Sequence, residues 1–132
     1  MRPVVMIIDD NSSIAQLLSI MLKNNGYTPI TAPNGLIALD LLKSSPRPSL
    51  ILTDYLMPGL NGCEFIEHIS AKSPYKNIPV VIITGSAVED LRFPTTKNFK
   101  GIIMKPFNND TVLNTVRHLI PENECSNSVC LA

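Results

Sequence analysis

Five short apolar runs, separated by stretches of helical periodicity, constrain the fold of this chain more than any other feature. Each run is rich in β-branched residues and is bounded by polar or turn-forming residues, which is typical of strands buried in a sheet. Pro29 lacks a backbone N–H, so the second run is expected to form an edge strand, whereas the uniformly apolar fourth run is expected inside the sheet. The predicted strands cover residues 4–9, 27–32, 49–54, 78–85 and 101–105.

Helical patterns connect these runs. A first helix is expected between the possible N-caps at residues 11–13 and Gly26, which suits the left-handed conformation past a helix end. Strands that alternate with helices favour a parallel sheet covered on both faces. The first helix is expected to bury a face made of Ile14, Leu17, Leu18, Met21 and Leu22. The other predicted helices cover residues 34–43, 63–72 and 109–119.

The length of the chain, 132 residues, fits one domain. We expect this domain to cover residues 1–120 and a C-terminal tail without clear periodicity to cover residues 121–132. No output domain fits after residue 120, so the protein is expected to be a single domain that works by docking to partners. The cysteines Cys63, Cys125 and Cys130 match no metal motif and are expected to be reduced thiols.

The charge balance argues against a nucleic-acid partner. Eleven basic and eleven acidic residues give a net charge of +0, whereas binding to phosphates needs a basic surface. No apolar run approaches the roughly 18 residues of a membrane-spanning helix. The N-terminus lacks the apolar region and cleavage site of a signal peptide. We therefore expect a cytoplasmic protein with no nucleic-acid or membrane partner.

Chemically active side chains stand at the ends of four predicted strands: Asp9 and Asp10, Asp54, Thr84, and Lys105. Ligands of such folds bind beyond the carboxyl ends of the strands, so these groups should converge. Three crowded carboxylates raise one another's pKa, and a Mg²⁺ ion with oxygen ligands would relieve the conflict. A hydroxyl and an ammonium suit phosphoryl oxygens, and the carboxylate of Asp54 can act as a nucleophile that forms an aspartyl phosphate.

Four motifs, IIDD, DYLMPGLNG, IITGS and MKPF, carry a family resemblance in their order and spacing. Over roughly residues 3–120, the sequence resembles the receiver domain of bacterial two-component response regulators. The resemblance implies a flavodoxin-like, doubly wound α/β fold whose five-stranded parallel sheet has the order 2-1-3-4-5, with helices on both faces. It also implies a cis peptide bond between Lys105 and Pro106.

The resemblance further implies that Asp54 accepts a phosphoryl group from a phosphohistidine on a sensor histidine kinase or a histidine phosphotransfer protein. Asp10, Asp54 and the backbone carbonyl of Leu56 would hold Mg²⁺, and Asp9 would bind it through water. Phosphorylation would then switch binding to a downstream protein target. Such a domain is a signalling phosphoacceptor rather than an enzyme, because it catalyses only its own phosphoryl transfer and autodephosphorylation.

Thr84 and Lys105 would contact the phosphoryl oxygens, but two positions depart from the family pattern. Ile102 stands where an aromatic residue is usual, and Pro94 interrupts the stretch that forms the fourth helix of the family. We therefore expect residues 86–100 to have low local stability and to become ordered on phosphorylation, with little rotamer change at Ile102.

Three rival functions share parts of this pattern. A haloacid-dehalogenase-type phosphatase needs a second acid two residues after the nucleophile, where this chain has Leu56. A flavodoxin-like FMN carrier needs a hydroxyl- and glycine-rich loop after the first strand, where this chain has DDNSS. A degenerate module that binds proteins independently of phosphorylation is the serious alternative, and the intact set of acids argues against it.

Overall fold

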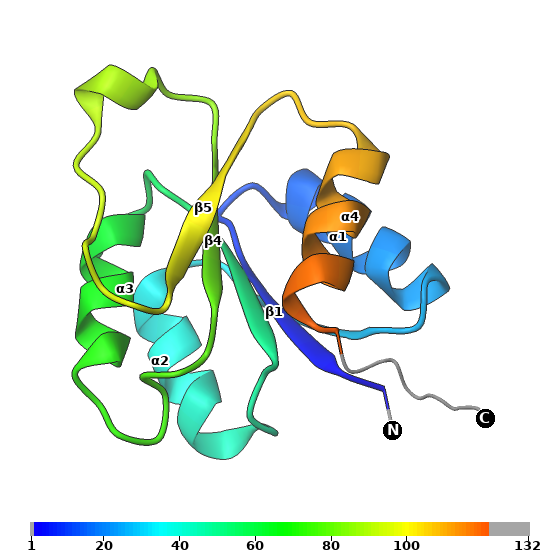
Figure 1. Cartoon of the computed structure of the whole chain (residues 1–132), viewed down its shortest axis with the longest axis horizontal. Helices are drawn as coiled ribbons and strands as arrows, with labels where there is room; N and C mark the ends of the chain where they lie inside the picture. The colour runs from blue at the N-terminus through cyan, green and yellow to red at the C-terminus, as the bar shows by residue number, and fades with distance from the viewer. Residues whose placement is uncertain (1, 122–132) are drawn as a thin grey trace.

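The five strands form one parallel sheet, shown in the computed structural model of Figure 1, which describes residues 2–121. The order of the strands is β2-β1-β3-β4-β5, and every pairing is parallel. This arrangement confirms the predicted fold class and strand order. The strands are β1 (Val4–Ile8), β2 (Thr28–Ala32), β3 (Leu50–Asp54), β4 (Val80–Thr84) and β5 (Phe99–Met104).

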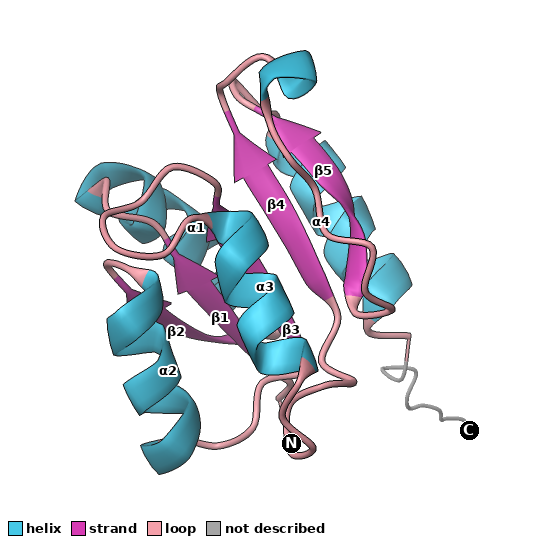
Figure 2. Cartoon of the chain, turned by 90° about the vertical axis from the view of Figure 1, so that its left-hand side faces the viewer, coloured by secondary structure: helices cyan, strands magenta, loops and turns pink. Residues whose placement is uncertain are grey.

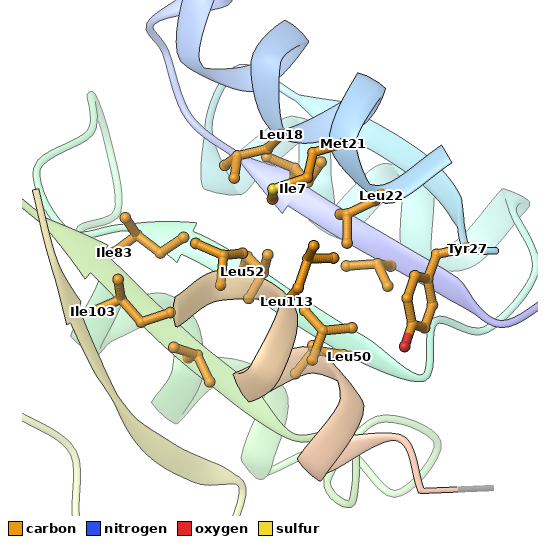
Figure 3. Packing of buried hydrophobic residues seen from close by; sticks show 14 of the residues in the cluster. Ile7, Leu18, Met21, Leu22, Tyr27, Leu50, Leu52, Ile83, Ile103 and Leu113 are labelled. Carbon is orange, nitrogen blue, oxygen red and sulfur yellow. The ribbon is translucent and has the colours of Figure 1, made fainter. Parts of the chain in front are cut away.

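Helices cover both faces of the sheet, as Figures 1 and 2 show. Helices α1 and α4 pack on one face, where alternate strand residues such as Ile7, Leu52 and Ile83 point toward them (Figure 3). Helices α2 and α3 pack on the other face, against the neighbouring residues of the same strands. The helices are α1 (Ser12–Asn24), α2 (Gly35–Ser44), α3 (Gly62–Ser70) and α4 (Asn109–Leu119).

An asparagine caps the N-terminus of each of these four helices. The side-chain oxygens of Asn11, Asn34, Asn61 and Asn108 accept hydrogen bonds from backbone N–H groups of the first turns. At α3 the cap is reciprocal, because the side chain of Glu64 accepts a hydrogen bond from the backbone N–H of Asn61. These caps satisfy donors that have no partner within a helix, and they explain why each helix begins where it does.

The predictions about individual strands are confirmed in their main points. Strand β2, which contains Pro29, lies at an edge and pairs only with β1. All five residues of β4 are buried, and this strand lies between β3 and β5. Strand β5 begins two residues before the predicted position 101, because Phe99 already pairs with Val80 ahead of a local irregularity in the ladder. Gly101 adopts a φ of 151° beside that irregularity.

The predicted buried face of α1 is wrong at Leu17, whose side chain is 49% exposed. Ala15 is buried in its place, with Leu18, Met21 and Leu22. Consecutive helical residues differ by about 100° around the helix axis, so Leu17 lies to one side of the stripe centred on Leu18. Apolar spacing alone therefore identified a face that is wider than the one that the sheet covers.

No α-helix runs through Pro94 in the segment between β4 and β5, as expected. The segment contains one short 3-10 turn, η1 (Val88–Asp90), and residues 91–98 form neither helix nor strand. The backbone N–H that an α-helix needs at this position is absent in proline. Within the described residues, no helix is long and apolar enough to cross a membrane.

Candidate functional site

The carboxyl ends of β1, β3, β4 and β5 meet at one edge of the sheet, and the sequence-predicted side chains meet there with them. Asp9 and Asp10 follow β1, and Asp54 is the last residue of β3. One carboxylate oxygen from each of these three residues lies within 4.8 Å of the other two. The parallel topology alone produces this meeting, because all strands run in the same direction and end at the same edge.

Lys105 joins the carboxylates from the end of β5. Its Nζ lies 3.1 Å from Oδ2 of Asp9 and 3.5 Å from Oδ1 of Asp54. The three side chains are largely buried, with exposed fractions of 19% for Lys105, 3% for Asp9 and 13% for Asp54. The backbone N–H of Lys105 donates to the carbonyl of Thr84 at 2.8 Å, so the last ladder bond between β4 and β5 positions the lysine. The Lys105–Pro106 peptide bond is cis, as the resemblance implied.

The electrostatics of the site favour a bound cation. Burial raises the pKa of Asp54, and the neighbouring carboxylate of Asp9 raises it further. The ammonium of Lys105 and the backbone N–H of Tyr55 oppose this shift but do not cancel it. Three carboxylates thus face one ammonium, and their oxygens are the ligand type that Mg²⁺ prefers.

Asp9 and Asp10 do not cap α1, although an aspartate before a helix can serve as an N-cap. The cap is Asn11, whose side chain accepts hydrogen bonds from the N–H groups of Ser13 and Ile14. The carboxylate of Asp9 instead accepts a hydrogen bond from the backbone N–H of Asn11 at 2.9 Å and pairs with Lys105. The hydrogen bond from Asn11 therefore orients the carboxylate of Asp9, which remains available to pair with Lys105.

Thr84, the last residue of β4, is 1% exposed. Its hydroxyl oxygen accepts a hydrogen bond from the backbone N–H of Ser86 at 3.1 Å. The hydroxyl can also donate one hydrogen bond of its own while it accepts this one. Thr84 thus links the strand ends to residues 85–91.

The loop between β3 and α3 packs closely against the backbone at the end of β3, where Asp54 lies. The carbonyl of Tyr55 accepts a hydrogen bond from the N–H of Gly62 at 2.7 Å, and Gly59 adopts a φ of 84° that disfavours other residues. Leu56, whose carbonyl was a predicted metal ligand, lies in this loop with its side chain 60% exposed. The left-handed conformation of Gly59 and the close approach of Gly62 to the backbone of Asp54 and Tyr55 therefore shape the turn that follows β3.

Gly62→Ala is expected to destabilise the protein by about 1–3 kcal/mol. A Cβ atom at this position would lie 2.8 Å from the carbonyl oxygen of Asp54 and 3.1 Å from Cα of Tyr55, and backbone atoms cannot easily give way. Urea unfolding measures the effect. Gly85→Ala is the matched control, because its Cβ would meet Lys105 only at an ordinary 3.6 Å. Equal stability losses in both variants would contradict the proposed close approach.

The sequence-based interpretation missed Tyr55. Its backbone N–H donates to Oδ1 of Asp54 at 2.9 Å, and its buried side chain reaches residues 92 and 93. The available signal was an aromatic residue with a hydroxyl directly after the strand-end carboxylate. Such a side chain, once buried, needs a hydrogen-bond partner.

An apolar groove lies beside the site on the α1 side of the molecule. It is lined by Ile14 and Leu17 of α1 and by Lys105, Pro106 and Phe107 of the β5–α4 loop. Leu17 and the nearby Ile20 are 49% and 52% exposed. The lysine that pairs with Asp54 therefore also lines an apolar surface that is open to solvent.

Comparisons with known proteins agree with this geometry. Residues 5–117 match the family model described as the response regulator receiver domain. The phosphate regulon transcriptional regulatory protein PhoB of Escherichia coli (strain K12) is 33% identical over 88 residues, which cover 67% of this chain and 38% of that protein. The DNA-binding response regulator MtrA of Mycobacterium tuberculosis is 29% identical over 94% of this chain and 53% of its own length. The chain thus spans roughly half or less of the length of these curated relatives.

Solved structures show the same likeness. The chemotaxis response regulator CheY4 of Vibrio cholerae has a TM-score of 0.80 at 31% identity, over 90% of this chain and 99% of that chain. The response regulator TrrA of Thermotoga maritima, in complex with Mg(2+)-BeF, has a TM-score of 0.75 at 28% identity, over 89% and 98% of the two chains.

Proposed function

This chain belongs to the response regulator receiver domain family of two-component systems, and on that premise we propose that Asp54 is its phosphoacceptor. The observation that carries the proposal is the convergence of Asp9, Asp10, Asp54 and Lys105 beside Thr84 at one edge of the sheet. We assign the receiver domain to residues 1–120 and a C-terminal tail to residues 121–132. The part of that tail beyond residue 121 lies outside the described residues.

The donor set fits a Mg²⁺ ion. Asp10, Asp54 and the backbone carbonyl of Leu56 would hold it, with Asp9 bound through water. The support is the cluster of carboxylate oxygens within 4.8 Å of one another and the pKa of Asp54, which burial and then the neighbouring carboxylate of Asp9 raise. When bound, the ion supplies positive charge that neutralises the oxygens of the transferring phosphoryl group.

The residues of the chain then act in sequence. A carboxylate oxygen of Asp54 attacks the phosphorus of a phosphohistidine, so that a P–O bond forms while the P–N bond breaks and the imidazole leaves. Lys105, already 3.5 Å from Asp54, pairs with a phosphoryl oxygen, and the hydroxyl of Thr84 donates to another. Attack by water later releases phosphate and restores Asp54. The domain catalyses this transfer and autodephosphorylation only on itself.

The phosphodonor is a sensor histidine kinase or a histidine phosphotransfer protein, and it docks on the groove beside Lys105. The exposed apolar side chain of Leu17 supports this choice, since it lines the groove together with Lys105. The phosphorylated domain binds a downstream protein target in the cytoplasm. A net charge of +0 supports the expectation that this chain itself contacts neither nucleic acid nor membrane.

Incubation with acetyl phosphate and Mg²⁺, followed by intact mass measurement and peptide mapping, tests the proposal. We expect the mass of one phosphoryl group to be added, on the peptide that contains Asp54. A degenerate module that binds partners without phosphorylation would remain unmodified. Modification on a different peptide would exclude Asp54 as the acceptor.

Asp10→Ala is expected to weaken Mg²⁺ binding by about tenfold or more, because it removes one carboxylate of the cluster. Isothermal titration with MgCl₂ measures the change. Asp40→Ala is the matched control, since it removes the same charge from an exposed position on α2. Equal Mg²⁺ affinity in the Asp10→Ala variant and the wild type would remove Asp10 from the site.

A further inference from the structure

The segment that follows η1 is attached to the body of the domain, although it has no regular structure. After η1 the chain passes beside α3 before it turns into β5 (Figure 1). The guanidinium of Arg92 makes two hydrogen bonds to the carboxylate of Glu67 on α3, at 2.8 and 3.1 Å. Both side chains are well exposed, at 61% and 40%, so this ion pair by itself holds the segment weakly.

A second attachment is buried and involves the residue after the phosphoacceptor. The hydroxyl of Tyr55 donates to the carbonyl of Arg92 at 2.9 Å and accepts from the backbone N–H of the same residue at 3.1 Å. Tyr55 is 5% exposed, so water does not compete easily for these bonds. We call this reciprocal pair of bonds, between the Tyr55 hydroxyl and the Arg92 backbone, the Tyr55 clamp.

Aromatic packing continues the attachment toward β5. The ring of Phe93 meets the ring of Tyr55 edge-on, with centroids 6.0 Å apart, and stacks on Phe99 at 5.9 Å. Pro94 and Asn98 are buried. Residues 92–99 are therefore held at both ends, by Tyr55 at the start and by strand β5 at the finish.

Apart from Leu91, which packs against the hydrophobic core on the α2–α3 face, residues 85–91 have no comparable attachment. Residues 87–90 are all exposed, and their backbone bonds stay within the turn, from Asp90 to Ala87 and from Leu91 to Val88. The bond from the N–H of Ser86 to the hydroxyl of Thr84 ties the segment to the site. A movement of the Thr84 hydroxyl therefore reaches this segment directly, and the next attachments along the chain are the packing of Leu91 and the hydrogen bonds of Arg92.

We propose that the Tyr55 clamp confines the structural response to phosphorylation to residues 85–91, while residues 92–99 stay in place. The inference rests on the proposed phosphorylation of Asp54. The clamp is well placed to remain closed, because the backbone of Tyr55 is itself fixed between Asp54 and Gly62. The sequence alone suggested that residues 86–100 respond to phosphorylation. The proposal excludes residues 92–99 from that response.

Hydrogen exchange of the full chain, with and without Mg²⁺ and beryllofluoride, tests the proposal. In the wild type, the exchange of peptides within 85–91 should change, and the exchange of peptides within 92–99 should not. A change in both segments would overturn the clamp. This comparison needs no variant, so it holds even if a substitution at Tyr55 prevents folding.

Tyr55→Phe removes both hydrogen bonds and keeps the buried ring. Without beryllofluoride, the amide of Arg92 should exchange about tenfold faster than in the wild type, and with beryllofluoride the response should spread into 92–99. Arg92→Ala is the control, because it deletes the exposed ion pair and keeps the clamp, so its response should stay within 85–91.

The two proposals fail in different ways. If the Arg92 amide exchanges equally fast in Tyr55→Phe and in the wild type, or if the variant's response stays confined, the clamp is wrong. If neither beryllofluoride nor acetyl phosphate affects the wild type, the proposed phosphorylation fails. The Arg92 amide comparison still decides about the clamp in that case, since it uses the unmodified protein.

Discussion

Asp54→Asn is expected to lower phosphoryl labelling by at least about a thousandfold, which is the largest effect that we predict. An amide has nearly the same shape as the carboxylate, and its oxygen can still accept the hydrogen bond from the N–H of Tyr55. It lacks the charge and the nucleophilic oxygen, so no aspartyl phosphate can form. The measurement is intact mass after incubation with acetyl phosphate and Mg²⁺.

The Asp54→Asn variant should remain folded, so that its loss of labelling reflects the missing nucleophile and not a loss of stability. Burial and the carboxylate of Asp9 raise the pKa of Asp54, so the ionised form is disfavoured in the folded state. Replacing it with a neutral amide is expected to leave the metal-free protein at least as stable as the wild type in urea unfolding. Labelling of Asp54→Asn at the wild-type rate would exclude Asp54 as the acceptor.

Thr84→Ala is expected to separate labelling from the structural response. Removal of the Thr84 hydroxyl leaves Asp9, Asp54 and Lys105 in place, so Asp54 should still be labelled by acetyl phosphate. The variant lacks the hydroxyl that joins the site to the N–H of Ser86, and therefore residues 85–91 should no longer respond to beryllofluoride. Hydrogen exchange and mass measurement on the same samples give the two readouts.

Thr84→Ser is the matched control, because it keeps the hydroxyl and removes only a methyl group. It should restore most of the response in residues 85–91. If the alanine variant responded like the wild type in both measurements, the assignment of Thr84 as the link would be wrong. If labelling were lost together with the response, Thr84 would be needed for transfer itself.

Ile102 is half-buried in β5, at the position where the family usually has an aromatic residue. The prediction that its rotamer changes little on phosphorylation stays a prediction. An aromatic cluster does occur nearby, but it is formed by Tyr55, Phe93 and Phe99 and includes no residue at position 102. The chain thus lacks the usual aromatic residue at position 102 and instead has aromatic contacts among Tyr55, Phe93 and Phe99.

Much of the candidate site could be predicted from the sequence because it depends on local rules and on one topological rule. Short apolar runs end at or beside Asp9, Asp54, Thr84 and Lys105. Once helices alternate with these runs, the strands must be parallel, and their ends must meet. Asparagines at the helix starts and Pro94 after the fourth strand acted through backbone chemistry that depends little on tertiary context.

The tertiary structure alone decided which apolar side chains are covered and where the irregular segment runs. Leu17 follows the helical period yet is exposed, because the sheet covers a narrower stripe than the period suggests. The bonds between Tyr55 and Arg92 join residues 37 positions apart in the sequence. Residues 91–98 have no periodicity that could predict their path, which depends on contacts with Tyr55, α3 and β5 that only the folded structure provides.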